Sequence, residues 1–373
     1  MIWNGNSSLF SIGSFALRWY GVLFVIGFLL SRKIYLYICK KEGQLTKDVE
    51  VLIVYIVVSS IVCARLGQVI FFQSELIWSK PIEIFLPFTF QPSFHFTGPQ
   101  GLSIHGALLG MLLAIWLFCR KQNRGQHYLQ LLDRIVIVVT LMAAFLLAGI
   151  FFNSEPIGKP TSSIMGTVLI NPVADGLLKT PCCMMRNPGG KNPLDYISVK
   201  KDTGPNVDST GRSPILMYLF FKPGATEQIV NEFLLGDVKT YLFDRSEYVY
   251  EPGTEPIHYT IFVEKDIYTA RLKTKGIARH PVQLYESISC LVLFTFMFWF
   301  WNKYQANTQS GRISGFFFTG FWCLHFVFDS LKVNQPLFFS GIDVTKGQAL
   351  SLPFILGGII VLVLSYRKAT IKT

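Results

Sequence analysis

Seven long hydrophobic stretches constrain the fold of this 373-residue chain more than any other feature. A helix needs roughly 20 residues to cross a hydrocarbon core about 30 Å thick, and each stretch is close to that length. Hydrophobic residues make up 51% of the chain and charged residues only 15%, a balance that is unusual for soluble domains. The sequence therefore predicts an all-α polytopic membrane protein with seven transmembrane helices, at residues 18–38, 50–72, 101–119, 130–152, 284–301, 313–331 and 348–366.

Basic residues in alternate connections predict the orientation of these helices. Short cytoplasmic loops carry an excess of Lys and Arg, and here such residues follow the first, third, fifth and seventh stretches. This pattern places the N-terminus outside, the C-terminus in the cytoplasm, and the long connection after the fourth helix outside. Because the formal charge of +11 is explained by this asymmetry, it does not favour binding to nucleic acid.

The long outer connection has the composition of a small folded domain. Apolar and polar residues alternate over 257–263 and again over 266–273, which predicts a β-hairpin that turns near residues 264–266. We further expect a buried strand at 215–221, a helix at 225–235, and mostly loop at 180–213. The chain thus divides into a membrane body at 1–158, an inserted extracytoplasmic α+β domain at 159–278, and a second part of the membrane body at 279–373.

Polar residues recur near the outer ends of the predicted helices, where burial in lipid makes them costly. Each residue alone has a structural explanation: Trp19 and Tyr20 as aromatic residues of the membrane interface, His105 as a hydrogen-bonded core histidine, and Arg65 or Glu286 as half of an ion pair. Structural pairs, however, should be scattered across the depth of the membrane. Their convergence at one level instead predicts a site at the outer face.

The residue types in this predicted site indicate a class of chemistry. An imidazole accepts a proton from a nucleophile, and guanidinium groups neutralise a phosphate. Together with carboxylates and amides at the depth of lipid headgroups, these groups favour a reaction on a lipid headgroup, with substrates that arrive laterally. No CxxC or His–Cys spacing indicates a metal site, and the adjacent Cys182 and Cys183 are poorly placed to bridge each other.

Several short motifs occur in a fixed order along the chain, each at the end of a predicted helix. They are Arg18-Trp19-Tyr20-Gly21, Ala64-Arg65-Leu66-Gly67, Ile104-His105-Gly106-Ala107, Asn153-Ser154-Glu155 with Gly158, Arg279-His280-Pro281 with Gln283-Leu284-Tyr285-Glu286, and Gly347-Gln348 with Leu350-Ser351-Leu352-Pro353. Together they cover everything except the inserted domain, and in this order they resemble the bacterial prolipoprotein diacylglyceryl transferase family.

The resemblance implies transfer of an sn-1,2-diacylglyceryl group from phosphatidylglycerol to the lipobox cysteine thiol of prolipoprotein signal peptides, the first step of lipoprotein maturation. It implies a multi-pass protein of the bacterial inner membrane with an outward-facing active site and with no metal or soluble cofactor. A thiol with a pKa near 8.5 needs a base at neutral pH, and His105 is the expected base or proton relay. The expected catalytic residues are His105, Tyr20, Glu155 and Asn153, and the expected substrate-binding residues are Arg65, Gly158, Arg279, His280, Gln283, Tyr285, Glu286, His325, Asp329 and Gln348.

The chain departs from the family pattern at positions where the family carries an arginine, an asparagine and a second arginine. These positions read Leu147, Ile150 and His325, and the later Arg-type position reads Lys332. Two alternatives therefore stay open: a relative that binds lipid or prolipoprotein without transfer, and a channel or transporter, which polar residues within membrane helices often mark. The absence of an internal repeat and the single depth of the polar residues argue against transport.

Overall fold

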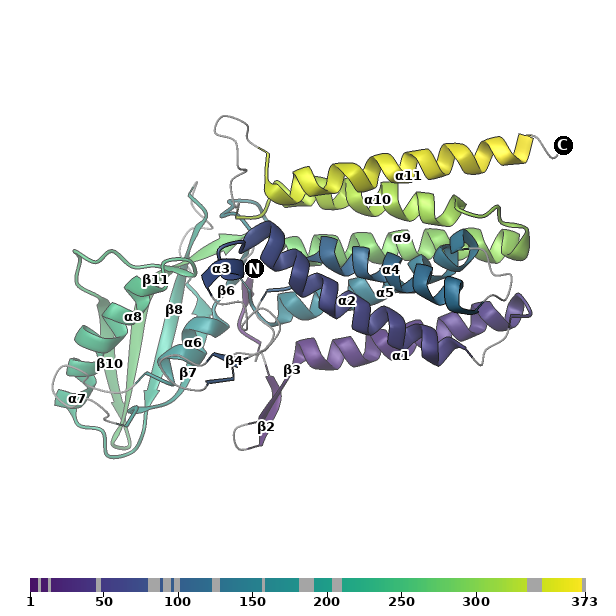
Figure 1. Ribbon diagram of the computed structural model, residues 1–373. Helices are drawn as coiled ribbons and strands as arrows, with labels where there is room; N and C mark the ends of the chain where they lie inside the picture. Colours follow the sequence, from purple (N-terminus) through teal and green to yellow (C-terminus); the bar gives the residue numbers. More distant parts are fainter. Residues whose placement is uncertain are drawn as a thin grey trace. The chain divides into compact units, whose positions relative to one another are not determined.

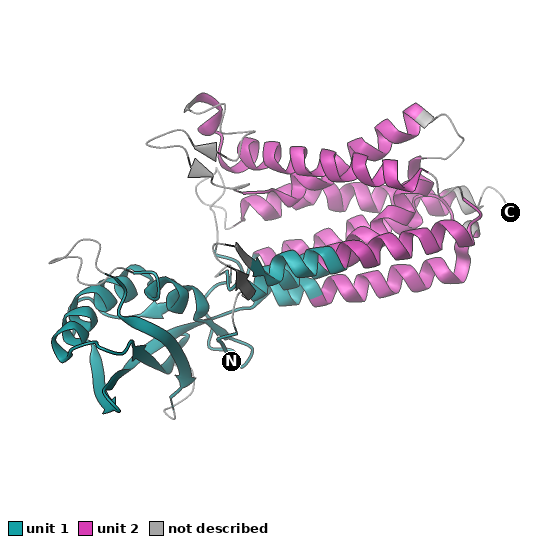
Figure 2. Cartoon of the chain, turned by 90° about the horizontal axis from the view of Figure 1, so that it is seen from below, with its two compact units in different colours: residues 1–26, 145–287, 330–334 teal, residues 27–144, 288–329, 335–373 magenta. Residues whose placement is uncertain are grey.

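The computed structural model describes residues 1–5, 8–12, 15–44, 48–79, 88–89, 95–96, 101–122, 128–155, 158–180, 191–202, 210–333 and 344–370. The chain forms two compact units (Figure 2). Unit 1 comprises Met1–Ile26, Phe145–Ser287 and Ser330–Asn334, and unit 2 comprises Gly27–Ala144, Ile288–Asp329 and Gln335–Thr373. Three long helices change unit along their length, so one end of each belongs to unit 1 and the rest to unit 2.

Seven long helices correspond to the seven hydrophobic stretches (Figure 1). In the described part of the chain, six of them are long and apolar enough to cross a membrane, which confirms a polytopic membrane protein. The remaining helix, α10, has 18 residues and carries Arg312, His325 and Asp329, so its crossing stays a prediction. The helices are α1 (Trp19–Lys41), α2 (Val49–Phe72), α4 (Ile104–Gln122), α5 (Tyr128–Phe152), α9 (Val282–Tyr304), α10 (Arg312–Asp329) and α11 (Lys346–Thr370).

Glycines allow two pairs of these helices to pack closely in unit 2. A side chain at Gly106 of α4 would overlap the Cys63 carbonyl of α2, and one at Gly110 would overlap the Ser59 carbonyl. Helices α10 and α11 also pack together, with Gly315 against the side chain of Leu362. Small residues let membrane helices approach backbone to backbone, and Gly106 thereby fixes the position of the neighbouring His105.

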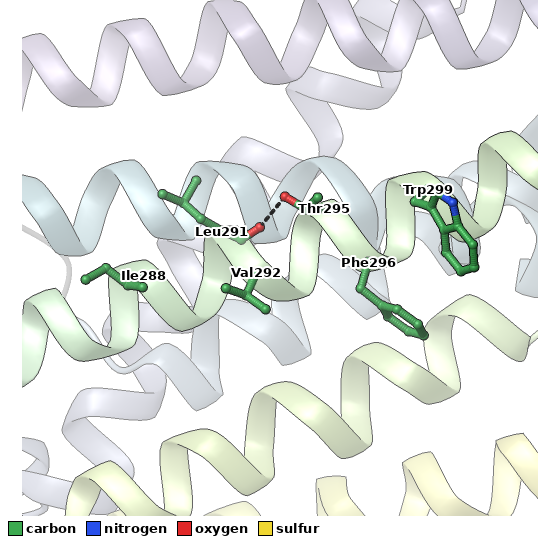
Figure 3. Close-up of a pocket in the computed structure, with 6 residues that line it drawn as sticks. All are labelled: Ile288, Leu291, Val292, Thr295, Phe296 and Trp299. Carbon is green, nitrogen blue, oxygen red and sulfur yellow. Dashed lines mark hydrogen bonds between the residues drawn. The ribbon is translucent and has the colours of Figure 1, made fainter.

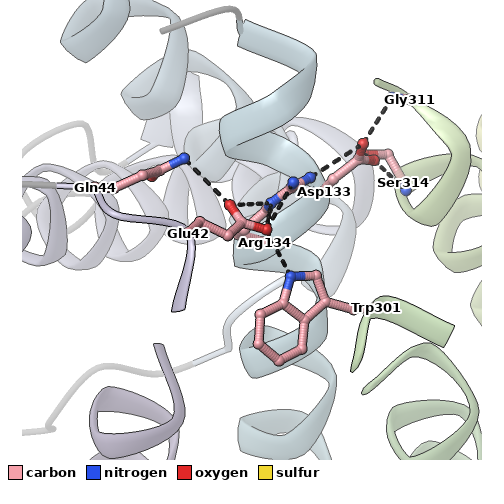
Figure 4. Close-up of polar contacts among 7 residues, drawn as sticks. All are labelled: Glu42, Gln44, Asp133, Arg134, Trp301, Gly311 and Ser314. Atoms are coloured by element: carbon pink, nitrogen blue, oxygen red, sulfur yellow. Dashed lines mark hydrogen bonds and ion pairs between the residues drawn. The ribbon is translucent and has the colours of Figure 1, made fainter. Parts of the chain in front are cut away.

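A buried ion pair lies at the opposite end of the same unit (Figure 4). Arg134 on α5 contacts the Glu42 carboxylate, with 2.8 Å between Nη2 and Oε1, and both side chains are almost fully buried. Trp301 of α9 donates its indole N–H to the same carboxylate oxygen at 2.7 Å. The pair therefore connects the end of α1 to α5 and α9. This structural role accounts for the buried Arg134, which needs no part in the chemistry.

The neighbouring carboxylate, Asp133, caps the N-terminus of α10. Its two oxygens accept the backbone N–H groups of Gly311 and Ser314, each at 2.7 Å, and the Ser314 hydroxyl as well. The first N–H groups of a helix have no partner within the helix, and a carboxylate there also interacts favourably with the helix dipole. Asp133 therefore holds α10 against α5 (Figure 4).

Unit 1 contains an α+β domain built on a seven-stranded sheet with the order β1-β6-β11-β8-β7, in which β9 and β10 also pair with β11. All pairs are antiparallel except β1 with β6. Short helices pack on one face of the sheet and form the core with it. The strands are β1 (Ile2–Trp3), β6 (Thr167–Leu169), β7 (Leu194–Lys201), β8 (Arg212–Phe221), β9 (Val249–Tyr250), β10 (His258–Glu264) and β11 (Ile267–Arg279), and the helices are α6 (Asn171–Leu177), α7 (Glu227–Glu232), the π-helix η2 (Phe233–Val238) and α8 (Lys239–Asp244).

Three predictions for this domain are confirmed. The β10–β11 hairpin turns at Lys265 and Asp266, both with the positive φ that a two-residue hairpin turn requires. Strand β8 buries alternate residues, among them Ile215 and Met217. The helix expected at 225–235 begins at Glu227, and the helical segment continues through η2 and α8 to residue 244.

The prediction of mostly loop at 180–213 is wrong at β7, which pairs with β8 along its whole length. A β-bulge near residues 194–196 interrupts its alternation, so the period-two pattern is weak there. Strand β1 was not predicted either, because two residues carry no periodic signal. Cys182 and Cys183 lie outside the described residues. The smaller elements are the β2–β3 hairpin (Ser8–Ile12 and Phe15–Arg18), α3 (Leu76–Ser79), β4 (Phe88–Thr89), β5 (His95–Phe96) and the 3-10 turn η3 (Gln305–Asn307).

Candidate functional site

The predicted site residues fall into two groups, one in each unit. In unit 1, helix α5 ends immediately before Asn153, and Ser154 adopts a left-handed conformation with φ of 62°. Such a residue terminates a helix, and the Ser154 hydroxyl accepts a hydrogen bond from the buried Asn171 amide at 3.2 Å. The turn presents Asn153, whose buried Oδ1 has no hydrogen-bond partner among the described residues.

Gly158 joins three motifs that are far apart in the sequence. It forms a bridge with Lys332, and its carbonyl accepts a hydrogen bond from Arg279 Nη1 at 2.9 Å. A Cβ at this position would overlap the His280 carbonyl oxygen and lie 2.9 Å from its carbon. Only a glycine permits this close approach, which brings Gly158 against the His280 backbone just before α9.

The first turn of α9 completes this group. Gln283, 2% exposed, donates its amide to the Glu155 carbonyl at 2.9 Å. Partial desolvation raises the pKa of the Glu155 carboxyl, and the Arg18 guanidinium opposes the shift. His280 lies beside Tyr285, with 3.5 Å between Nδ1 and the phenol oxygen. Desolvation lowers the pKa of His280, which favours the neutral ring near pH 7.

Two basic side chains of this group, Lys332 and Arg279, bind other residues of the protein. Lys332 forms an ion pair with Glu286, with 2.7 Å between Nζ and Oε1, and both side chains are largely buried. Arg279 donates from Nε to the Glu247 carbonyl at 2.9 Å in addition to its bond to Gly158, and burial lowers its pKa. These contacts give both cations a structural role, with Lys332 fastening its loop to α9.

Tyr20 lies where α1 packs closely against α5. A Cβ at Gly149 would come 3.0 Å from the Tyr20 Cα, so this glycine allows the contact. The neighbouring Trp19 packs on Phe152, with 5.8 Å between ring centroids. The Tyr20 side chain itself is 37% exposed, which leaves it accessible to a ligand.

The second group lies in unit 2 and centres on His105. This residue is in the first turn of α4 and is only 3% exposed. The start of α4 is fastened to α2, because Ser103 donates its backbone N–H to the Ala64 carbonyl at 3.0 Å. Arg65 follows directly on α2 and is half-buried. The local structure therefore places a rigid imidazole beside the helix that carries a guanidinium.

Helix α10 supplies a second imidazole to the same place. His325 is 8% exposed, and its ring centroid lies 5.5 Å from that of His105. Trp322 packs against both rings, at 4.7 Å from His105 and 5.3 Å from His325. Phe354 of α11 stacks on Trp322, with 4.6 Å between ring centroids, and lies 6.1 Å from His105. The two histidines thus lie close together among aromatic side chains.

The end of α10 is fastened to the start of α11. Gln348 donates from Nε2 to the Phe326 carbonyl at 3.1 Å and accepts the Thr345 N–H at 3.0 Å. The Thr345 hydroxyl in turn donates to the Asp329 carboxylate. Gln348 and Asp329 therefore hold the two helices together. Asp329 lies one turn beyond His325 on α10.

Leu147 and Ile150 are half-buried on α5 and supply no polar group. The structure adds Trp322 and Thr345 to the residues around the site. Nothing in their local sequence distinguishes Trp322 from other apolar helix residues, so only packing identifies it.

An apolar groove of about 500 Å³ on α9 is separate from both groups (Figure 3). The Thr295 hydroxyl in its wall donates to the Leu291 carbonyl at 2.8 Å, so the groove is suited to hydrocarbon. It is lined by Ile288, Leu291, Val292, Thr295, Phe296 and Trp299. Among the described residues, no three His, Cys, Asp or Glu side chains lie together in a way that could hold a metal ion.

Comparisons with known proteins agree with these motifs. The family model described as prolipoprotein diacylglyceryl transferase matches residues 7–364. Three relatives are each named phosphatidylglycerol–prolipoprotein diacylglyceryl transferase. The protein of Tolumonas auensis is 25% identical and covers 99% of this chain and 98% of its own length. The protein of Bacteroides fragilis is 24% identical, and the match covers 99% of this chain and 97% of its own length. The protein of Porphyromonas gingivalis is 24% identical, and the match covers 96% of this chain and 92% of its own length. The match over nearly the whole length shows that this membrane protein belongs to the prolipoprotein diacylglyceryl transferase family.

Proposed function

We propose that this chain transfers an sn-1,2-diacylglyceryl group from phosphatidylglycerol to the lipobox cysteine thiol of prolipoprotein signal peptides. The sulfur attacks the glycerol carbon that carries the phosphate, a C–S bond forms, and the C–O bond to the phosphate breaks. Glycerol phosphate leaves with the electron pair, and His105 takes the thiol proton. The observation that carries the proposal is the buried His105, held at the start of α4 in a chain that matches the family over residues 7–364.

The other predicted residues take supporting roles. Tyr20, Asn153 and Glu155 offer hydroxyl, amide and carboxyl groups to the reacting lipid or peptide. Asn153 is especially suited to this role, because its Oδ1 is buried and has no partner within the described part of the chain. Arg65 supplies positive charge to the phosphate.

The remaining predicted residues bind or position the substrates. Gly158, Arg279 and Gln283 hold the turn after α5 against the start of α9, which fixes the groups that meet the lipid. The other proposed substrate-binding residues are His280, Tyr285, Glu286, His325, Asp329 and Gln348.

We place this chemistry at the outer face of the bacterial inner membrane. All seven long helices cross the bilayer, α10 included, with the N-terminus outside and the C-terminus in the cytoplasm. The α+β domain at 159–278 is then extracytoplasmic, between membrane parts at 1–158 and 279–373. The basic residues at or beyond the C-terminal ends of α1, α4, α9 and α11 support this topology.

The direct test uses the full chain in phosphatidylglycerol vesicles with a lipobox peptide, and thioether product is measured by mass spectrometry. We expect product from wild type, none above background from His105→Gln, and unchanged product from His258→Gln, an exposed histidine on β10. Peptide and lipid binding without product from wild type would instead identify a relative that binds without transfer. Flux of solute across the vesicles without product would identify a transporter.

A further inference from the structure

Two histidines, one on α4 and one on α10, lie close together in unit 2, with 5.5 Å between their ring centroids. We infer that His105 and His325 form a dyad that shares a single proton, in which His105 is the base for the thiol and His325 is the acid for the leaving phosphate. The inference rests on the proposed function and assigns a role to a residue that stands where the family pattern has an arginine.

Geometry limits the dyad to one proton. The ring centroids are 5.5 Å apart, and both side chains are more than nine-tenths buried. Two positive charges at this separation in poorly solvated surroundings repel each other strongly, so the two rings titrate as a coupled pair. The rings of Trp322 and Phe354 pack against His105 and keep bulk solvent, which would screen that repulsion, away from it.

The surroundings of the two rings favour the proton on His325 over His105. The Trp322 indole stacks nearly parallel to the His325 ring, with 14° between the planes, and the face of an indole attracts a cation. The Asp329 carboxylate lies one turn further along α10, on the same face of the helix. His105 has the more tilted contact with Trp322, at 31°, and no carboxylate one turn away on α4.

The helices beside the two histidines carry other titratable side chains. On α11, between Lys346 at the start and Tyr366 near the end, the sequence has no titratable side chain. Arg65 is the charged residue of α2 next to the contact with α4. The positive charges of Lys346 and Arg65 oppose a second proton on the dyad. Neither side chain replaces His325 as a proton donor. The other titratable side chains on α2, α4 and α10, apart from Asp329, are Glu50, Tyr55, Cys63, Cys119, Arg120, Lys121, Arg312 and Cys323.

The dyad accounts for every proton in the reaction. The thiol proton moves to neutral His105 as the C–S bond forms, and the His325 imidazolium gives its proton to the phosphate oxygen as the C–O bond breaks. The dyad then holds one proton on His105, and transfer to His325 through a bridging water restores the starting state. The net change moves the thiol proton to glycerol phosphate, with no other reactant.

The experiment measures thioether formation by the full chain in phosphatidylglycerol vesicles between pH 5 and 9. For wild type we expect a bell-shaped profile of kcat/KM, because the competent state holds one of two protons. His325→Arg keeps a positive charge beside the leaving phosphate but cannot donate its proton near neutral pH, so its rate should be lower than that of wild type at about pH 7 and should no longer fall at high pH. His325→Gln should lose at least about 10-fold and also lose the high-pH decline. The matched control His258→Gln should keep the wild-type profile.

The outcomes separate the two proposals. No product from wild type at any pH overturns the proposed function and the dyad with it. Wild-type turnover that rises without a high-pH decline, or a bell-shaped profile retained by a folded His325→Gln, overturns the dyad alone. Size-exclusion profiles and apparent Tm values establish which variants are folded. If a variant does not fold, the pH profile of wild-type turnover still tests the dyad.

Discussion

Replacement of Gly158 by alanine tests whether this residue joins the motifs of unit 1. The added Cβ would overlap the His280 carbonyl oxygen and lie 2.9 Å from its carbon and 3.2 Å from its nitrogen. All three atoms belong to backbone, so no flexible side chain can rotate away. The two chain segments must move apart by roughly 1 Å to reach ordinary contact distances.

That separation affects three hydrogen bonds. They join Arg279 Nη1 to the Gly158 carbonyl at 2.9 Å, Lys159 N–H to the Leu331 carbonyl at 2.8 Å, and His280 N–H to the Lys159 carbonyl at 3.1 Å. Each contributes about 1 kcal/mol net, so we expect Gly158→Ala to lower the free energy of unfolding by about 3 kcal/mol. For a chain of this size, the apparent Tm should fall by roughly 4 °C.

The assay is thermal unfolding of purified protein in phosphatidylglycerol nanodiscs, paired with the thioether assay. Gly236→Ala is the matched control, because a Cβ at this helical glycine has no heavy atom within 4 Å, and alanine there should be neutral or stabilising by about 0.5–1 kcal/mol. We also expect at least a 10-fold loss of kcat/KM for Gly158→Ala, since the Asn153 turn loses its support (about 1.4 kcal/mol per tenfold). A Tm within 1 °C of wild type, by an order-of-magnitude criterion, would refute the close-approach argument.

Three further predictions concern other contacts. Asp133→Ala leaves two buried N–H donors of α10 without their acceptor, and we expect a loss of about 3 kcal/mol in thermal unfolding; an unchanged Tm would contradict the capping role. Glu286→Gln and Lys332→Met should each cost about 2 kcal/mol, and the double variant should cost at least 1 kcal/mol less than their sum; additive losses in this double-mutant cycle would argue against the ion pair. Desolvation lowers the pKa of His280 below 6.5, so its contribution to stability is complete above pH 6.5 and is lost as the pH falls through the folded-state pKa. The Tm of His280→Gln should therefore depend less on pH between about 6.5 and 5 than that of wild type, and parallel Tm profiles would count against this prediction.

Patterns that are local in the sequence predicted local structure well. The hydrophobic stretches correspond to the long helices because a bilayer requires about 20 consecutive apolar residues, and the β10–β11 hairpin follows from two-residue alternation on either side of Lys265 and Asp266. The same reasoning failed for β1 and β7. A strand of two residues has no periodicity, and a bulge disrupts that of β7, so both depend on partners elsewhere in the chain.

The sequence by itself determined which polar residues lie at helix ends and, through the order of their motifs, the family to which the chain belongs. Only the tertiary structure decided their partners. Glu286 pairs with Lys332, Gly158 admits the His280 backbone, and His105 meets His325 across 220 residues of chain. Hydropathy and periodicity report the environment of each residue separately. Which side chains come into contact depends on how helices and strands pack against one another, and that packing is set by interactions between segments distant in the sequence.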